Sequence, residues 1–272
     1  MAEKTGPIIR LEKVWKTFNG EVVLRDLTLE IERSRTTVVI GPSGCGKTVL
    51  LKHMIGLLRP DRGRTFFDDM EITRTPEHQL VPIRHRVGYV FQSNALFDSM
   101  TVAENVCFPM TERGVRNQDQ LQRRCDEVLG LVGLDGMQEK MPEELSGGQK
   151  KRVALARAIA LDPEVILYDE PTTGLDPIRA DLINELILKL QAELKTTAVV
   201  VTHDMDSARK VGDRIVMLYD GRILADTTPE GLKEVTNETV VRFVEGRATK
   251  EELDTLSYRR AGQGSDDERT HA

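Results

Sequence analysis

The residues best suited to chemistry form a glycine-rich octapeptide early in the chain. Gly-Pro-Ser-Gly-Cys-Gly-Lys-Thr fits the pattern GxxxxGK[ST], with Lys47 and Thr48 at its end. Backbone N–H groups of such a loop close around phosphate oxygens, and the following helix N-terminus adds partial positive charge. The lysine is expected to reach the terminal phosphates and the threonine hydroxyl to bind Mg²⁺. The predicted phosphate-binding residues are Gly41, Pro42, Ser43, Gly44, Cys45, Gly46, Lys47 and Thr48, with the Cys45 thiol itself inert.

A second candidate is an acidic pair at the end of an apolar run. Val165-Ile166-Leu167-Tyr168 is followed by Asp169 and Glu170. The run predicts a buried strand, and open α/β sheets bind ligands at the carboxyl ends of their strands. Asp169 is expected to hold Mg²⁺, directly or through water, and Glu170 to orient and polarise an attacking water. Alone the pair could equally be a solvated strand end, but the glycine-rich loop upstream favours catalysis.

Strands alternating with helices position these groups. A helix is predicted over 47–55, closed by Gly56, and another carries Ile178, Leu182, Leu186, Leu190 and Leu194 as one apolar stripe. This alternation implies a parallel sheet covered on both faces, with an inserted helical subdomain at about 98–160. The predicted strands are 8–14, 21–31, 36–40, 64–68, 165–168, 198–202 and 215–219.

Composition narrows the class of protein. The chain has 272 residues, 39% hydrophobic and 30% charged, which suits a folded globular protein. The net charge is -6, whereas nucleic-acid-binding domains typically carry an excess of Lys and Arg. Three cysteines without CxxC spacing favour a reducing cytosol. We see no secretory leader and no apolar stretch long enough to span a bilayer, so we expect any membrane role to run through partners.

A third motif, Leu145-Ser146-Gly147-Gly148-Gln149, precedes a predicted helix. Ser146 and Gln149 have capping-box spacing, which needs no ligand. Two glycines in a first turn cost about 1 kcal/mol each relative to alanine, however, and make sense if a phosphate approaches the backbone. This pentapeptide, lying between the loop and the acidic strand, resembles the signature of ABC (ATP-binding cassette) ATPases. The resemblance covers roughly residues 8–245.

The resemblance implies a P-loop NTPase (RecA-like) fold, with a parallel-sheet core, an antiparallel β-subdomain and an inserted helical subdomain. It implies Mg²⁺-dependent ATP hydrolysis by a homodimer, in which the signature of one subunit closes over the ATP of the other. By position, Phe18 stacks on adenine, although the residue could equally be core. Gln92 touches the metal or the water, and His203 contacts the γ-phosphate. Asp176 lies at the dimer seam, and it also suits a plain helix cap before Pro177.

A finer resemblance lies around Gln92 and Asp176. The segment 91–102, the following Glu104-Asn105-Val106 and Phe108-Pro109, and the segment 170–178 resemble the ATPase of Mla-type transporters. Those systems move phospholipids between the inner and outer membranes. The resemblance implies a peripheral position on the cytoplasmic face of the inner membrane. It also implies an inner-membrane permease, an MCE-domain lipid-binding protein and a small STAS-domain protein as partners.

Alternatives remain within and beyond this family. The Ala95-Leu96-Phe97 stretch also resembles amino-acid importer ATPases. A soluble ABC ATPase acting on ribosomes or DNA is disfavoured, because the chain has one cassette and no heptad run. A regulatory module without catalysis is disfavoured too, because every reacting group is present. No nucleic-acid partner is expected.

The chain is expected to divide into a nucleotide-binding domain, 1–245, and a polar C-terminal extension, 246–272. Thr249 and Glu252 have capping-box spacing, so a short helix is predicted there. The extension either frays or docks on the neighbouring ATPase subunit.

Overall fold

The computed structural model describes residues 6–248, 250, 253 and 254. The chain divides into two compact units, Met1–Lys233 and Glu234–Ala272. The strands are β1 Ile9–Phe18, β2 Glu21–Ile31, β3 Thr36–Ile40, β4 Arg62–Phe67, β5 Met70–Glu71, β6 Val87–Val90, β7 Val165–Asp169, β8 Thr197–Thr202, β9 Arg214–Tyr219 and β10 Arg222–Thr227. The helices are α1 Lys47–Met54, α2 Glu77–Arg84, α3 Val102–Glu112, α4 Gln118–Leu131, α5 Gly147–Ile159, α6 Pro177–Leu194, α7 Met205–Val211 and α8 Glu238–Glu245, with 3₁₀ turns η1 Pro142–Glu144 and η2 Gly231–Glu234.

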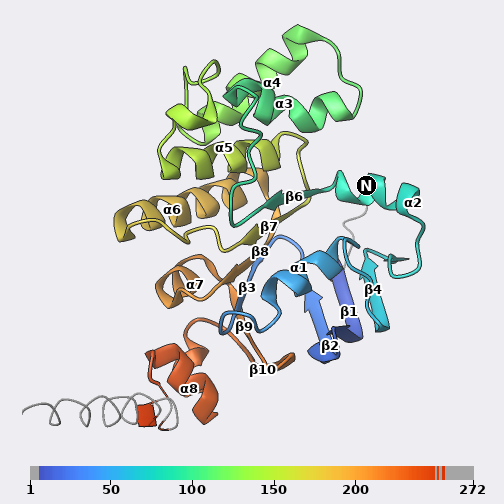
Figure 1. The fold of residues 1–272 in the computed structure, drawn as a ribbon, viewed down its shortest axis with the longest axis vertical. Coiled ribbons are helices and arrows are strands. Elements are labelled where there is room, and N and C mark those ends of the chain that lie inside the picture. Colours follow the sequence, from blue (N-terminus) through green and yellow to red (C-terminus); the bar gives the residue numbers. More distant parts are fainter. Residues whose placement is uncertain (1–5, 249, 251–252, 255–272) are drawn as a thin grey trace, which may run out of the picture. The chain divides into compact units, whose positions relative to one another are not determined.

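A six-stranded sheet is the frame of the first unit (Figure 1). Its strand order is β10-β9-β3-β8-β7-β6, and the neighbours from β9 to β6 are parallel. β3, β7 and β8 are buried along their whole length, which explains why they read as continuous apolar or β-branched runs. The predicted α/β fold with a parallel sheet is therefore confirmed.

A second, antiparallel sheet has the order β2-β1-β4-β5. Its buried residues join those of α1, α2 and one face of the parallel sheet in a single apolar core. α1 contacts β1 and β4 of one sheet and β7 of the other. The helix that follows the glycine-rich loop is thus held between the two sheets, and the loop is fixed at its head.

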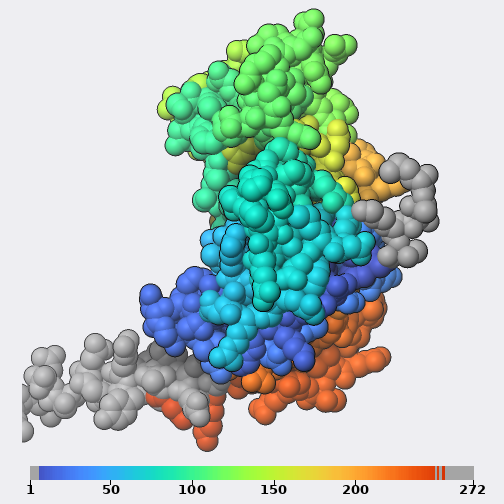
Figure 2. Space-filling view, turned by 90° about the vertical axis from the view of Figure 1, so that its right-hand side faces the viewer, coloured from blue at the N-terminus to red at the C-terminus, as the bar shows by residue number. Residues whose placement is uncertain are grey.

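Between β6 and β7 the chain forms the helical subdomain. α3 begins with a complete capping box at Thr101, and Asn117 caps α4. α5 packs against α3, α4 and α6 and also contacts β6. In Figure 2 the green atoms of this subdomain lie at one end of the face shown, α2 (teal) lies in the middle, and the blue atoms of β1 and β2 lie beyond it.

One sequence prediction fails on α6. Ile178 is 76% exposed and Leu182 is 48% exposed, whereas Leu186 and Leu190 are buried. A spacing of four residues advances about 40° around a 3.6-residue helix at each step, so a long i+4 series drifts off the buried face. The buried face instead comprises Ile183, Asn184, Leu186, Ile187 and Leu190.

The second unit contains α8, which Asn237 caps and which ends at Gly246 in the left-handed region. The two compact units meet after Lys233, twelve residues before the predicted boundary at 245. The division into a nucleotide-binding domain and a C-terminal extension stays a prediction. Thr249 and Glu252, predicted to start a helix, lie outside the described residues. Among the described residues, no helix has both the length and the apolar character needed to cross a membrane.

Candidate active site

The glycine-rich loop joins the end of β3 to the first residue of α1. Gly44 and Gly46 have φ values of 81° and 103°, which side-chain-bearing residues adopt only with strain. Gly46 caps α1 without any side-chain hydrogen bond, which leaves first-turn N–H groups for an anion. Lys47 Nζ donates to the carbonyl oxygens of Gly41 at 2.8 Å and Pro42 at 3.0 Å. The lysine ammonium is therefore held at the mouth of the loop.

Four further groups reach this loop because parallel strands end at one edge of the sheet. Asp169 ends β7 and Glu170 follows it, while His203 follows β8 and Gln92 lies two residues beyond β6. A cavity of about 360 Å³ is lined by Val23, Ser43, Gly44, Gly46, Lys47, Thr48, Val49, Gln92, Glu170 and His203. The cavity thus joins most of the predicted loop residues to the predicted catalytic residues, which are Gln92, Glu170 and His203.

Asp169 is buried beside the loop and accepts two hydroxyl hydrogen bonds. Thr48 Oγ1 donates to Oδ1 at 2.9 Å, and Tyr89 Oη donates to Oδ2 at 3.0 Å. Oxygen ligands of this kind suit Mg²⁺, which takes one or two carboxylates and completes its shell with phosphates and water. Among the described residues no three His, Cys, Asp or Glu side chains form a metal-binding group. The donors present fit a metal that arrives with a nucleotide.

Glu170 has a strained backbone and a crowded carboxylate. Its φ is 50°, in the left-handed region, and its N–H donates to the Val201 carbonyl at 3.0 Å. Oε2 lies 2.8 Å from His203 Nδ1 and accepts from Thr173 Oγ1 at 3.1 Å, while Oε1 lies 3.5 Å from Lys47 Nζ. These contacts fix a carboxylate at the cavity wall, where it can orient and polarise a water molecule.

The remaining loop residues have supporting positions. A side chain at Gly41 would meet the Leu218 carbonyl oxygen at 2.2 Å, so glycine is required there. Burial raises the pKa of the Cys45 thiol, and the nearby Lys47 charge only partly opposes this. A protonated thiol is a poor nucleophile, in agreement with the expectation that Cys45 is inert.

The signature residues and Asp176 do not line this cavity. Ser146 and Gln149 form the predicted capping box, in which Gln149 Oε1 accepts from Ser146 N at 2.9 Å. An added Cβ at Gly147 or Gly148 would meet only ordinary contacts, at 3.8 and 3.9 Å. No contact among the described residues requires glycine at these two positions. That a phosphate approaches the backbone there stays a prediction. Asp176 caps α6 by accepting from Arg179 N at 3.0 Å.

Phe18 does not line the cavity either. Its side chain is 39% exposed, and Lys16 Nζ lies over the ring, 5.3 Å from the centroid. An exposed aromatic face is compatible with stacking, and the adenine contact stays a prediction.

Sequence reasoning missed three side chains that hold the site. Tyr89 donates to Asp169, as described above. Lys151 is buried and donates to the Gln92 carbonyl at 2.7 Å. Burial lowers the pKa of Lys151, and the charges of Glu170 and Asp169 oppose that shift. Arg157 donates to the carbonyls of Asn94 at 2.8 Å and Ala95 at 2.7 Å. No residue pattern marks these contacts, because each joins α5 or β6 to a distant segment.

An apolar groove of about 490 Å³ lies beside the segment after Gln92. It is lined by Arg84, His85, Val87, Gly88, Tyr89, Phe91, Ala95, Phe97, Phe108, Pro109, Glu112, Arg157, Ala158, Leu161 and Pro163, and we call it the docking groove. Phe97 is 41% exposed and its ring centroid lies 4.7 Å from that of Phe108. Val102 and Met110, which follow in the same segment, are buried inside the subdomain.

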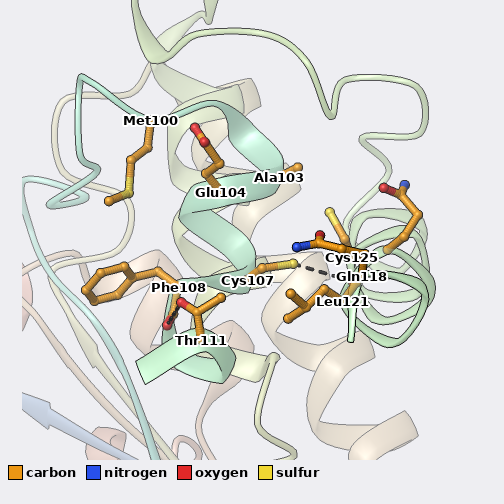
Figure 3. A pocket seen from close by; sticks show the side chains of 10 residues that line it. Met100, Ala103, Glu104, Cys107, Phe108, Thr111, Gln118, Leu121 and Cys125 are labelled. Carbon is orange, nitrogen blue, oxygen red and sulfur yellow. Dashed lines mark hydrogen bonds between the residues drawn. The ribbon is translucent and has the colours of Figure 1, made fainter. Parts of the chain in front are cut away.

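A separate pocket of about 370 Å³ lies between α3 and α4 (Figure 3). Cys107 Sγ donates to the Leu121 carbonyl across it at 3.4 Å. The lining residues include one carboxylate, Glu104, but no lysine or arginine, so this pocket has no cation for a phosphate.

Comparison with known proteins identifies the family. The family model described as ABC transporter matches residues 24–173. The chain belongs to the ABC transporter family. A dimeric structure of the ATP-binding cassette MJ0796 in a post-hydrolysis state, bound to ADP and Pi, is similar with a TM-score of 0.75 and 34% identity, covering 81% of this chain and 98% of that one. The ABC ATPase described here is the ATP-binding motor subunit of a transporter, built on a P-loop NTPase fold.

Its relatives serve several transporters. The probable ribonucleotide transport ATP-binding protein mkl of Mycobacterium leprae is 39% identical over 242 residues, 89% of this chain and 70% of that protein. The intermembrane phospholipid transport system ATP-binding protein MlaF of Haemophilus influenzae is 39% identical over 227 residues, 84% and 86% of the two chains. The methionine import ATP-binding protein MetN 2 of Rhodococcus jostii is 38% identical over 266 residues, 94% and 78%.

Proposed function

We propose that this ABC ATPase hydrolyses ATP with Mg²⁺ and drives phospholipid movement between the inner and outer membranes. The observation that supports ATP hydrolysis is that Lys47, Glu170 and His203 line one cavity. The phospholipid assignment rests on the resemblance of segments 91–102 and 170–178 to Mla-type ATPases. The similarity to MlaF over most of both chains supports it.

The chain's own residues have distinct tasks in this proposal. Thr48 and Asp169 hold Mg²⁺, which supplies positive charge to the phosphates. Lys47 neutralises the terminal phosphates from the mouth of the loop. Glu170 accepts a hydrogen bond from the attacking water and orients it for attack. His203 and Thr173 hold that carboxylate from its other side.

The active unit is proposed to be a homodimer with shared sites. Ser146, Gly147, Gly148, Gln149 and Asp176 do not line their own chain's cavity. They are free to close over the nucleotide of a second copy, as the resemblance implies. The dimeric state of the similar MJ0796 cassette supports this arrangement.

The docking groove is proposed to receive an inner-membrane permease, with MCE-domain and STAS-domain proteins in the same complex. Gln92 senses the nucleotide, and the residues after it form one side of the groove. Nucleotide-driven closure would therefore move the groove wall against the permease. In this proposal the ATPase is a peripheral subunit at the cytoplasmic face of the inner membrane.

The test is co-purification from membranes, with identification of partners and bound lipid. Recovery of a permease with an MCE-domain protein and phospholipid is the expected result. The groove variant Phe97→Asp serves as the negative control for the co-purification. It should remain folded but no longer recover these partners. An amino-acid permease without an MCE-domain or STAS-domain partner would select the importer alternative, which the similarity to MetN 2 favours. That result would leave the ATPase assignment intact.

A further inference from the structure

Tyr89 connects the docking groove to the carboxylate of Asp169. On the parallel pair β6–β7, Tyr89 lies opposite Leu167. Facing residues of adjacent strands project to the same side of a sheet, and so do residues two apart on one strand. Tyr89 and Asp169 therefore share a face, and the tyrosine hydroxyl donates to Asp169 Oδ2 at 3.0 Å.

Both oxygens of Asp169 are oriented by hydroxyl groups. Thr48 Oγ1 donates to Oδ1 at 2.9 Å, and Tyr89 donates to Oδ2. Asp169 is only 4% exposed, so water has little access to replace either donor. A phenol carries its proton at neutral pH and can therefore donate to the carboxylate.

The ring of Tyr89 stands in the wall of the docking groove. Its centroid lies 4.2 Å from that of Phe91, which is itself 37% exposed. A groove wall needs only the apolar ring, and phenylalanine would supply it, as Phe91 does next to it. The hydroxyl is therefore explained by Asp169 and not by packing.

We propose that Tyr89 is a positioning residue, which orients Asp169 for the nucleotide's metal and couples that carboxylate to the packing of the docking groove. This inference rests on the proposed function, because it takes Asp169 as a metal ligand. Partners that orient a ligating carboxylate matter nearly as much as the ligand, and their loss typically costs roughly 10- to 100-fold in metal affinity. Asp169 keeps Thr48 as a second donor, so the lower end of that range applies.

The first experiment measures metal binding without turnover. Mn²⁺ replaces Mg²⁺ as a paramagnetic probe, and its affinity for the full-length protein is measured by electron paramagnetic resonance with a non-hydrolysable ATP analogue. Tyr89→Phe keeps the ring and should weaken Mn²⁺ binding about tenfold. The matched control is Tyr219→Phe, which removes a hydroxyl from a side chain that is 38% exposed, and its Mn²⁺ affinity should equal that of the unmodified protein.

The second experiment tests the coupling to the groove. Phe91→Ala removes the ring that packs on Tyr89 without touching the hydroxyl. It should weaken Mn²⁺ binding in the native background, by less than Tyr89→Phe does, and it should have no further effect once Tyr89 is phenylalanine. Such non-additivity is expected when two residues act through one path. Independent, additive effects of the two substitutions would overturn the coupling.

The variant Asp169→Asn distinguishes a failure of the Tyr89 inference from a failure of the proposed metal site. If Asp169→Asn leaves Mn²⁺ affinity unchanged, the metal assignment of the proposed function fails. If Asp169→Asn abolishes Mn²⁺ binding while Tyr89→Phe binds as the unmodified protein does, the positioning role of Tyr89 alone is overturned. Thermal unfolding of each variant verifies that affinities are compared between folded proteins.

Discussion

Replacing Glu170 by glutamine should separate ATP hydrolysis from ATP binding. The amide has nearly the shape of the carboxylate and still lies near Thr173 and His203, but it cannot act as a base. Lost general-base catalysis typically costs 10²- to 10⁴-fold in rate, or about 2.7 to 5.5 kcal/mol of activation free energy. Turnover should therefore fall at least 10²-fold.

The same substitution should leave ATP binding intact or strengthen it. Without a nucleotide, Glu170 Oε1 lies 3.5 Å from Lys47 Nζ. Two unit charges at that distance attract by about 1.2 kcal/mol at the dielectric constant of water and about 4.7 kcal/mol at an effective value of 20. Lys47 is 6% exposed and Glu170 is 8% exposed, so the lower figure is a minimum. Releasing Lys47 from the carboxylate then tightens ATP binding by roughly sevenfold or more.

The assay pairs single-turnover hydrolysis of labelled ATP with equilibrium binding of the same nucleotide. Glu193→Gln is the matched control, since it removes an exposed carboxylate near the end of α6, and both measurements should match the native protein. Near-native turnover of Glu170→Gln would refute the assigned role of Glu170. ATP binding that weakens tenfold would refute the competition between carboxylate and phosphate for Lys47.

Three other predictions address assembly, coupling and stability. Mixing a Ser146→Arg chain with a Lys47→Ala chain should restore ATPase activity that neither has alone, because one site of a mixed dimer is intact; nucleotide-trapped protein that stays monomeric in solution scattering would contradict shared sites. Phe97→Asp should abolish stimulation of the ATPase by the permease without unfolding the exposed site, as measured in reconstituted vesicles; unchanged coupling would remove Phe97 from the contact. Burial lowers the pKa of His53 below 6.5, so the unfolded chain takes up a proton first and the free energy of unfolding should fall as the pH drops below 6.5. In urea titrations from pH 5 to 7, His53→Met should flatten this slope by at most about 1.4 kcal/mol per pH unit, and an equal slope would exclude His53 as its source.

The parts of the fold encoded by local pattern could be read from the sequence. β3 runs over Thr36–Ile40 as expected, because five consecutive buried residues leave a continuous apolar or β-branched run. The loop residues and Glu170 could be placed for a related reason. Each follows a buried strand directly, so parallel pairing alone brings them to one edge of the sheet.

Contacts between distant segments could not be read in this way. Tyr89 lies 80 positions from Asp169 in the chain, and Lys151 lies 59 from Gln92. A tyrosine in a strand and a lysine in a helix are both ordinary residues for those elements, so neither composition nor periodicity marks them. The stripe on α6 failed at Ile178 and Leu182 because an i+4 series drifts around the helix and leaves the face that neighbouring elements bury.

The attachment of α5 to the segment after β6 has a kinetic consequence. The signature glycines begin this helix. Further along it, Lys151 and Arg157 donate to the backbone carbonyls of Gln92, Asn94 and Ala95. The helix also lies so close to β6 that a side chain at Gly88 would meet the Ala158 carbonyl oxygen at 2.5 Å. With these contacts, α5 cannot shift relative to β6 and the segment that follows it. Time-resolved fluorescence probes on the signature and on the docking groove should therefore report one relaxation with a single rate constant, and no transient should show one region displaced while the other is still at rest.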